Sequence, residues 1–140
     1  MDTLLVFCLN NELIGIDINK VKEVTESQDP IYVPGVPEYV SGVVNIRGDV
    51  VPVISLKKRL GMLGDEQSKL LLIVEEKGRI AGIRVDKFYG TKKVVFNLIN
   101  RSSELISTKQ EKDFFLGVYE SSDKPILILN LDRALSKEAK

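Results

Sequence analysis

Gly42 Val43 Val44 Asn45 Ile46 Arg47 Gly48 Asp49 Val50 Val51 Pro52 Val53 Ile54 Ser55 Leu56 is the stretch that decides the fold. Residues 40–46 and 50–56 are rich in β-branched side chains, which favour strands. The three residues between them, 47–49, suit a tight loop because Gly48 adopts a positive φ without a steric penalty. The stretch therefore predicts a β-hairpin with Arg47 at its tip or rim.

Short apolar runs broken by turn residues continue on both sides of this hairpin. Such runs are typical of an all-β chain and not of a helical bundle, whose apolar residues recur every three or four positions. In one of them, Ile14, Ile16 and Ile18 alternate with other residues, so one face of that strand is buried. We expect eight or nine strands, over 4–9, 13–18, 40–46, 50–56, 70–75, 80–85, 94–96, 114–120 and 126–131.

Short helices are expected at connections and near the C-terminus. Asn19 can cap one of them, in which Val21 and Val24 would share a face because they are three residues apart. A second is expected over 57–62, and a third would follow Asp132 as its cap, over 133–137.

The length of 140 residues suits one domain. Pro34 and Pro37 predict an extended connection over 33–37, because proline removes backbone donors. The segment 61–68 holds Gly61, Gly64 and a polar linker, so it is the expected boundary between two interlocked lobes of a single domain, 1–140.

The composition excludes several classes of protein. Twenty basic and twenty acidic residues cancel, so the charge that binds nucleic acids or anionic membranes is absent. Cys8 is the single cysteine, and its apolar surroundings predict a buried thiol in a reducing compartment. The N-terminus lacks a basic signal-peptide region, and no apolar run approaches a membrane span. These features predict a cytoplasmic protein.

Catalytic, metal and cofactor motifs are also missing. The chain has no histidine, which excludes histidine-dependent triads and the commonest metal ligand. Carboxylate pairs such as Glu75 with Glu76 lie in strand ends and loops, where solvated surface charge is the ordinary interpretation. The glycines have neither the GxxxxGK[ST] spacing nor the GxGxxG spacing that would bind phosphate at a helix N-terminus. We expect no enzyme, no metal and no cofactor.

The stretch 42–56 closely resembles the G-x-x-N-L-R-G-x-x-x-P-V-x-D-L signature of CheW domains. Three further features agree in order: the segment 13–24 with the prolines after it, the G-[IV]-x-V-D motif at 82–86, and the closing hairpin over 117–132. The resemblance spans about 4–135. The order and spacing of these motifs together make the resemblance specific.

Two positions depart from the family signature. Ile46 replaces Leu, which conserves volume. Ser55 stands where the family often has Asp, which removes a possible charge partner near Arg47 or Lys57.

The resemblance implies an all-β fold, mainly two small five-stranded SH3-like β-barrel lobes packed together, with a groove between them. It implies a non-catalytic adaptor of bacterial chemotaxis in the cytoplasm, recruited to receptor arrays at the inner membrane. One surface would bind the regulatory domain of the histidine kinase CheA. The groove would bind the cytoplasmic hairpin tip of a chemoreceptor. No residue is singled out for the kinase contact.

A groove that grips a helical coiled coil needs apolar side chains for the helix ridge and a few charged ones for register. The apolar candidates are Val21, Val24, Val85 and Phe88. Arg47 is the polar candidate because its guanidinium has a forked set of donors, and Glu23 is its complement. The hairpin-shaping residues are Gly42, Asn45, Gly48 and Pro52. For the valines, ordinary core packing is an equal alternative.

The rival from another class is a small β-barrel that binds oligonucleotides. It would need basic residues beside exposed aromatics for base stacking. Nine aromatic residues and a balanced charge argue against it.

Overall fold

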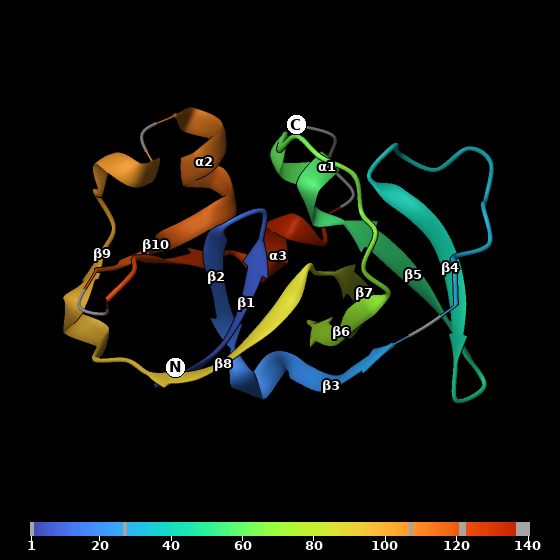
Figure 1. Ribbon diagram of the computed structural model, residues 1–140, viewed down its shortest axis with the longest axis horizontal. Helices are drawn as coiled ribbons and strands as arrows, with labels where there is room; N and C mark the ends of the chain where they lie inside the picture. Colours follow the sequence, from blue (N-terminus) through green and yellow to red (C-terminus); the bar gives the residue numbers. More distant parts are fainter. Residues whose placement is uncertain (1, 27, 107, 121–122, 137–140) are drawn as a thin grey trace.

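The computed structural model describes residues 2–26, 28–106, 108–120 and 123–136 (Figure 1). Eleven strands are present in this part of the chain. They are β1 (Thr3–Leu9), β2 (Glu12–Asp17), β3 (Val21–Glu26), β4 (Val40–Ile46), β5 (Asp49–Ser55), β6 (Leu70–Glu76), β7 (Arg79–Arg84), β8 (Lys87–Lys93), β9 (Ile99–Asn100), β10 (Phe115–Tyr119) and β11 (Ile126–Leu129).

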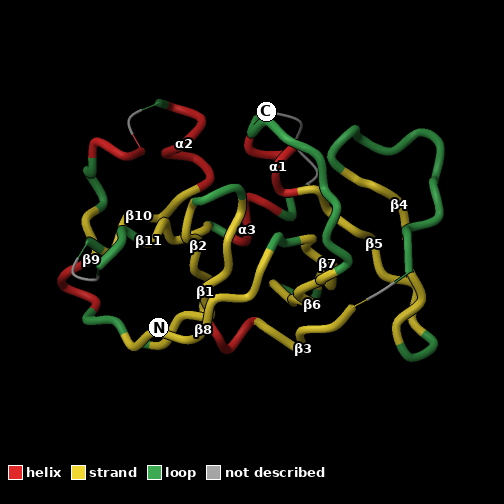
Figure 2. Tube along the Cα trace, viewed as in Figure 1, coloured by secondary structure: helices red, strands yellow, loops and turns green. Residues whose placement is uncertain are grey.

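The helices are short and lie at connections between strands or, in one case, after the last strand, as Figure 2 shows. The α-helices are α1 (Leu56–Leu60), α2 (Lys109–Phe114) and α3 (Leu131–Ala134), and the 3-10 helices are η1 (Ile18–Lys20), η2 (Phe96–Leu98) and η3 (Glu104–Ile106). The prediction of a mainly β fold with short connecting helices is confirmed.

The strands form two sheets, one per lobe. The six-stranded sheet has the order β8-β1-β2-β11-β10-β9, and the five-stranded sheet has the order β3-β6-β7-β5-β4. The N-terminal hairpin therefore joins the C-terminal strands in one lobe, while the middle of the chain builds the other. The predicted two-lobe architecture is confirmed, and the lobes interlock (Figure 1).

The segment 61–68 does not separate the lobes. It connects α1 to β6, and both β5 and β6 belong to the five-stranded sheet. The chain instead changes lobe between β2 and β3 and again between β7 and β8. The chain returns to the same sheet because Leu71 and Ile73 of β6 pack in one core with Val53 of β5.

Each sheet is apolar on both faces, which explains continuous apolar runs such as 4–9 and 70–74. In β6, Leu71 and Ile73 face the core inside the five-stranded lobe, whereas Leu72 and Val74 face the core between the lobes. In β1, odd-numbered residues such as Phe7 face the core between the lobes, and even-numbered ones face a core of the six-stranded lobe. Alternating side chains therefore supply two cores from one strand.

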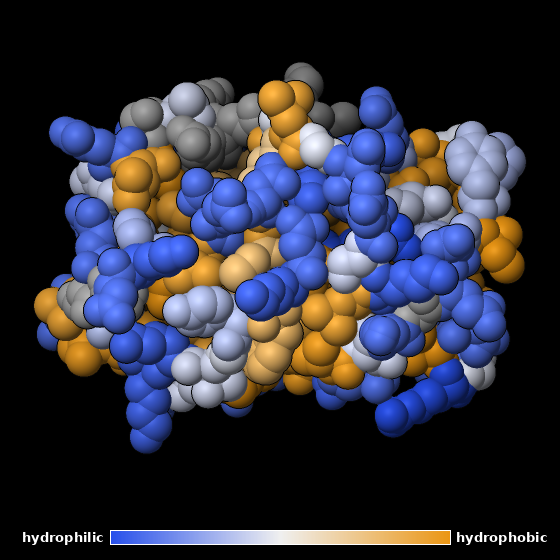
Figure 3. Space-filling model, in the orientation of Figure 1, coloured by the Kyte–Doolittle hydropathy of each residue, from blue (hydrophilic) through white to orange (hydrophobic). Residues whose placement is uncertain are grey.

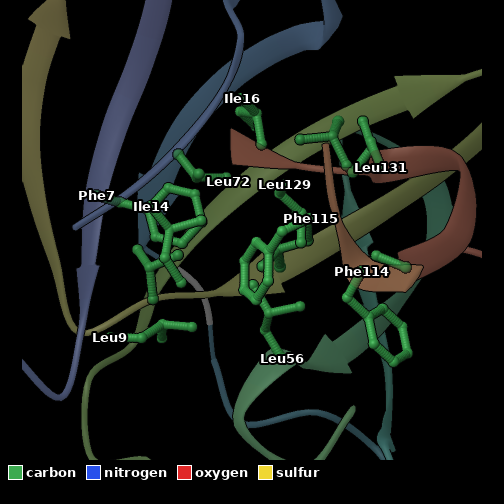
Figure 4. Packing of buried hydrophobic residues seen from close by; sticks show 14 of the residues in the cluster. Phe7, Leu9, Ile14, Ile16, Leu56, Leu72, Phe114, Phe115, Leu129 and Leu131 are labelled. Atoms are coloured by element: carbon green, nitrogen blue, oxygen red, sulfur yellow. The ribbon is translucent and has the colours of Figure 1, made fainter. Parts of the chain in front are cut away.

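The core between the lobes is the central one and holds the two sheets together. Figure 4 shows Phe7, Ile14 and Ile16 of the six-stranded sheet near Leu56 and Leu72 from the other lobe. Full burial of one such side chain contributes about 1.5–3 kcal/mol. Because both lobes contribute to it, we infer that the lobes fold as a single domain.

Four local features of the structure differ from the sequence-based expectations. Residues 18–20 form η1, which Asp17 caps, and β3 follows where a longer helix was expected. No strand covers 94–96 as expected. The strand in this region is β8, which ends before Val94. Asn130, and not Asp132, caps α3, and position 137 of the expected helix lies outside the described residues. Helix α2 was not predicted, because its six residues are too few for a periodic apolar pattern.

Candidate partner-binding groove

The β4–β5 hairpin ends in a two-residue turn and not in the expected three-residue loop. Ile46 pairs with Asp49, which leaves Arg47 at φ 53° and Gly48 at φ 90°. Two positive φ values are typical of the type I′ turns that match strand twist. The side chain of Asn45 accepts a hydrogen bond from the Gly48 N–H at 2.9 Å, which fixes the turn. Arg47 is therefore held in a conformation that costs a non-glycine residue about 1–2 kcal/mol.

Gly42 and Pro52 act further down the same hairpin. Gly42 has φ 146°, and a Cβ at this position would lie 2.2 Å from the carbonyl oxygen of Ile31. Ile31 and Val43 exchange two backbone hydrogen bonds, of 2.8 and 2.9 Å, beside it. Pro52 pairs with β4 only, because the β7 ladder begins at the next residue, Val53. Its missing N–H therefore leaves the β7 ladder intact.

Arg47 and Glu23 form an ion pair. The Nη2 atom of Arg47 donates to Oε2 of Glu23 at 3.1 Å, and the two side chains are 81% and 25% exposed. The pair joins the β4–β5 hairpin to β3, so it links the two edge strands of the five-stranded sheet. An exposed pair contributes about 0–1 kcal/mol, so the fold does not depend on it.

A bulge in β3 places Val21 and Val24 on one side of the strand. Val21 pairs with Val74 and Val24 with Leu72, with a register shift between positions 21 and 23. Opposed residues in an antiparallel pair share a face, and Leu72 and Val74 face the core between the lobes. The expectation that these valines share a face is correct, but the reason is a β-bulge and not a helix.

A second bulge, in β8, determines on which side of that strand Phe88 lies relative to the residues that follow it. Phe88 pairs with Phe7, which faces the core between the lobes, and the register shifts before the next pair, Gly90 with Val6. Val24 is 38% exposed and Phe88 is 42% exposed. These side chains therefore lie on the inter-lobe side of two edge strands, one from each sheet, and form the apolar part of the candidate groove.

Val85 does not reach the surface. It is 0% exposed and belongs to the core between the lobes. A fully buried side chain cannot touch a docked helix, so its placement agrees with the alternative of ordinary core packing. Val85 is therefore a core residue and not a groove residue.

Ser55 has a carboxylate partner even though it replaces the family's Asp. Its Oγ donates to Oε1 of Glu66 at 2.5 Å and accepts from the N–H of Lys58, so Ser55 also caps α1. Glu66 comes from the polar linker and supplies a carboxylate at this site. Local sequence does not predict this contact, because the path of the linker depends on the tertiary fold.

Asp86, from the G-[IV]-x-V-D motif, links the lobes. Its Oδ1 lies 2.8 Å from Nζ of Lys57, a residue only 4% exposed, and its Oδ2 accepts from the Asn10 N–H at 2.7 Å. The side chain of Asn10 in turn donates to the carbonyl of Leu63 at 2.8 Å. The motif's aspartate is therefore structural and fixes the β1–β2 turn against α1.

Arg59 forms a second link between the lobes. Its Nη2 donates to the carbonyls of Arg133 at 3.1 Å and Ser136 at 2.9 Å, and its guanidinium lies 4.1 Å from the ring centroid of Tyr39 and 5.2 Å from that of Phe114. Burial lowers the pKa of Arg59 from its ordinary value. The group remains charged at neutral pH, so α3 is held against α1 by a charged donor.

A cavity of about 530 Å³ lies elsewhere, between Leu60 and Met62 of one lobe and Phe115 and Leu127 of the other. It contains none of the predicted site residues. Within the described residues, no cluster of three or more His, Cys, Asp or Glu side chains could hold a metal ion. No helix in this part of the chain has the length and apolar character needed to cross a membrane.

Comparisons with known proteins agree with this fold. The family described as CheW-like domain matches residues 3–139. A Chemotaxis protein CheW of Thermotoga maritima is 28% identical over 134 residues, which is 95% of this chain and 87% of that protein. One from Bacillus subtilis is 43% identical over 61 residues, 44% of this chain and 39% of that protein. The crystal structure of the scaffolding protein TtCheW from Thermoanaerobacter tengcongensis superimposes with a TM-score of 0.87 at 33% identity, over 99% of this chain and 90% of that one.

Proposed function

Because the chain belongs to the CheW-like domain family, we propose that it is a non-catalytic adaptor that couples chemoreceptors to a histidine kinase in chemotaxis. The observation that carries this proposal is the match of the family to residues 3–139, with a CheW scaffolding protein superimposing over nearly the whole chain. In this proposal the protein acts in the cytoplasm and is recruited to receptor arrays at the inner membrane.

The receptor partner is the cytoplasmic hairpin tip of a chemoreceptor, and its site is the groove of Val21, Val24 and Phe88. Half-exposed apolar side chains on two facing edges suit the ridge of a helix. Arg47 stands at the rim, where its ion pair with Glu23 leaves the guanidinium 81% exposed. The other N–H donors of the guanidinium remain available to a receptor carboxylate.

The kinase partner is the regulatory domain of CheA, and we assign it to the outer end of the five-stranded lobe. Ile31, Tyr32 and Val50 are 72%, 74% and 70% exposed there. Figure 3 shows apolar surface at the right-hand end of the long axis, where Figure 1 places β4 and β5. The Ile31–Val43 bridge ties the segment that carries Ile31 to β4, and an exposed apolar patch suits docking of another folded domain.

Two binding assays test the assignment. Arg47→Glu should weaken binding of a chemoreceptor tip fragment by about fivefold or more, because it puts a carboxylate beside Glu23 and removes the donor fork. Val50→Asp should weaken binding of the CheA regulatory domain and leave receptor binding unchanged. Lys58→Glu, an exposed charge change on α1, is the matched control.

The outcomes separate the parts of the proposal. Wild-type protein that binds neither partner in titration calorimetry would refute the adaptor role. Binding with no loss in Arg47→Glu would refute the role of Arg47 alone. Titration with single-stranded DNA tests the oligonucleotide-binding rival, for which β8 offers three lysines and two aromatics, and we expect no binding.

A further inference from the structure

The two edge strands that flank the groove carry unpaired charges of opposite sign. Glu26 ends β3 and Lys93 ends β8, and both are exposed. Neither has an ion-pair partner in the part of the chain that the structure describes. Two lysines near the start of β3 are neutralised: Lys20 pairs with Glu76, and Lys22 with Glu75 at 2.7 Å.

The bulges point both charges toward the groove. Glu26 pairs with Leu70, which packs against the core between the lobes, so Glu26 shares a side with Val24. Lys93 pairs with Thr3, which lies on the same side of β1 as Phe7, so Lys93 shares a side with Phe88. Without the bulge in β8, strict alternation would put positions 88 and 93 on opposite faces.

The two charges lie at opposite ends of the groove. Leu70, the partner of Glu26, accepts a hydrogen bond from the N–H of Val85 at 3.1 Å, so the end of β3 lies near the start of β8. Lys93 lies beside Thr3 at the start of β1, where η1 leads into β3. The edges therefore run in opposite directions, from an acidic end at Glu26 to a basic end at Lys93.

We propose that this groove selects an amphipathic helix with a basic side chain at the Glu26 end and an acidic side chain at the Lys93 end, with its apolar ridge against Val24 and Phe88 between them. The inference rests on the proposed receptor-binding function and names the chemistry of that partner. Six strand residues span roughly 17 Å, which corresponds to about eleven helical residues, or three turns. The two charges of the partner should therefore be about eleven residues apart.

Charge reversal tests the polarity. A chemoreceptor cytoplasmic tip fragment is titrated into wild-type protein, Lys93→Glu and Glu26→Lys at low and at 0.5 M salt. Each reversal should weaken binding about two- to fivefold at low salt, and the difference should shrink at high salt because exposed charges are screened. Lys58→Glu and Glu38→Lys carry the same charge changes at exposed positions off the groove and should bind like the wild type.

Complementary changes in the fragment give the decisive result. Replacing one acidic fragment residue by lysine should restore binding to Lys93→Glu and weaken it to the wild type. If the fragment binds the wild type and both reversals equally, the polarity is wrong while the receptor-binding function stands. If the fragment does not bind the wild type at all, the proposed function itself fails.

Discussion

Gly42→Ala should destabilise the protein far more than the same change at Gly48, although both glycines have a positive φ and lie in the same hairpin. At Gly42 the added Cβ would lie 2.2 Å from the Ile31 carbonyl oxygen and 2.7 Å from its carbon, both backbone atoms. At Gly48 no atom lies within 4 Å of the added Cβ. A comparison of the two variants therefore separates the effect of backbone strain alone from that of strain combined with a steric clash.

The magnitudes follow from the contacts. Strain from a glycine-only conformation at Gly42 costs about 1–3 kcal/mol. Displacing Ile31 would break its two backbone hydrogen bonds with Val43, at about 1 kcal/mol each. The free energy of unfolding should fall by roughly 3–5 kcal/mol in Gly42→Ala and by about 1–2 kcal/mol in Gly48→Ala.

Urea unfolding followed by circular dichroism measures the difference. With an m-value of about 2 kcal/mol/M, the midpoint should fall by about 2 M for Gly42→Ala and by less than 1 M for Gly48→Ala. If the variant keeps its fold, binding of the kinase regulatory domain should also weaken, because Ile31 belongs to the proposed docking patch. Equal midpoints in the two variants would refute the assignment of the clash.

Three further predictions concern the polar contacts. Ser55→Asp should destabilise the protein, because it places a second carboxylate against Glu66, and adding Glu66→Gln should recover most of the loss in urea unfolding; failure of the rescue would contradict the contact. Arg59→Ala should lower the free energy of unfolding by about 2–4 kcal/mol, and Arg59→Lys should recover less than half, because an ammonium does not reproduce the packing of the planar guanidinium against the rings of Tyr39 and Phe114; full recovery would argue against it. Hydrogen bonding from Arg79 lowers the pKa of Asp132 below its ordinary value. The stabilising effect of the ionised Asp132 carboxylate is therefore present above the unfolded pKa of about 3.9 and is lost as the pH falls through the lower folded pKa. Asp132→Asn should therefore be less stable than the wild type at pH 7 and converge with it as the pH falls through the lowered folded pKa of Asp132, and a constant difference would refute the cause.

The candidate site was only partly predictable. Arg47 at a hairpin tip follows from the local sequence, because Gly48 and the flanking β-branched residues specify the turn. The Arg47–Glu23 contact joins positions 24 residues apart, and it depends on β3 and β4 being the two edges of one sheet. Strand β8 was missed because its lysines, glycine and exposed aromatics lack an alternating pattern, and the bulge at its centre removes the remaining periodicity.

The fold class, the hairpin at Arg47 and the family follow from the sequence, because turn chemistry and side-chain alternation are local properties of the chain. Only the tertiary structure shows which strands pair, where the bulges of β3 and β8 fall, and that Val85 is core while Val24 and Phe88 are exposed. Those features depend on partners distant in the sequence. A bulge reverses the face of every later residue in its strand, and only the ladder with the neighbouring strand reveals it.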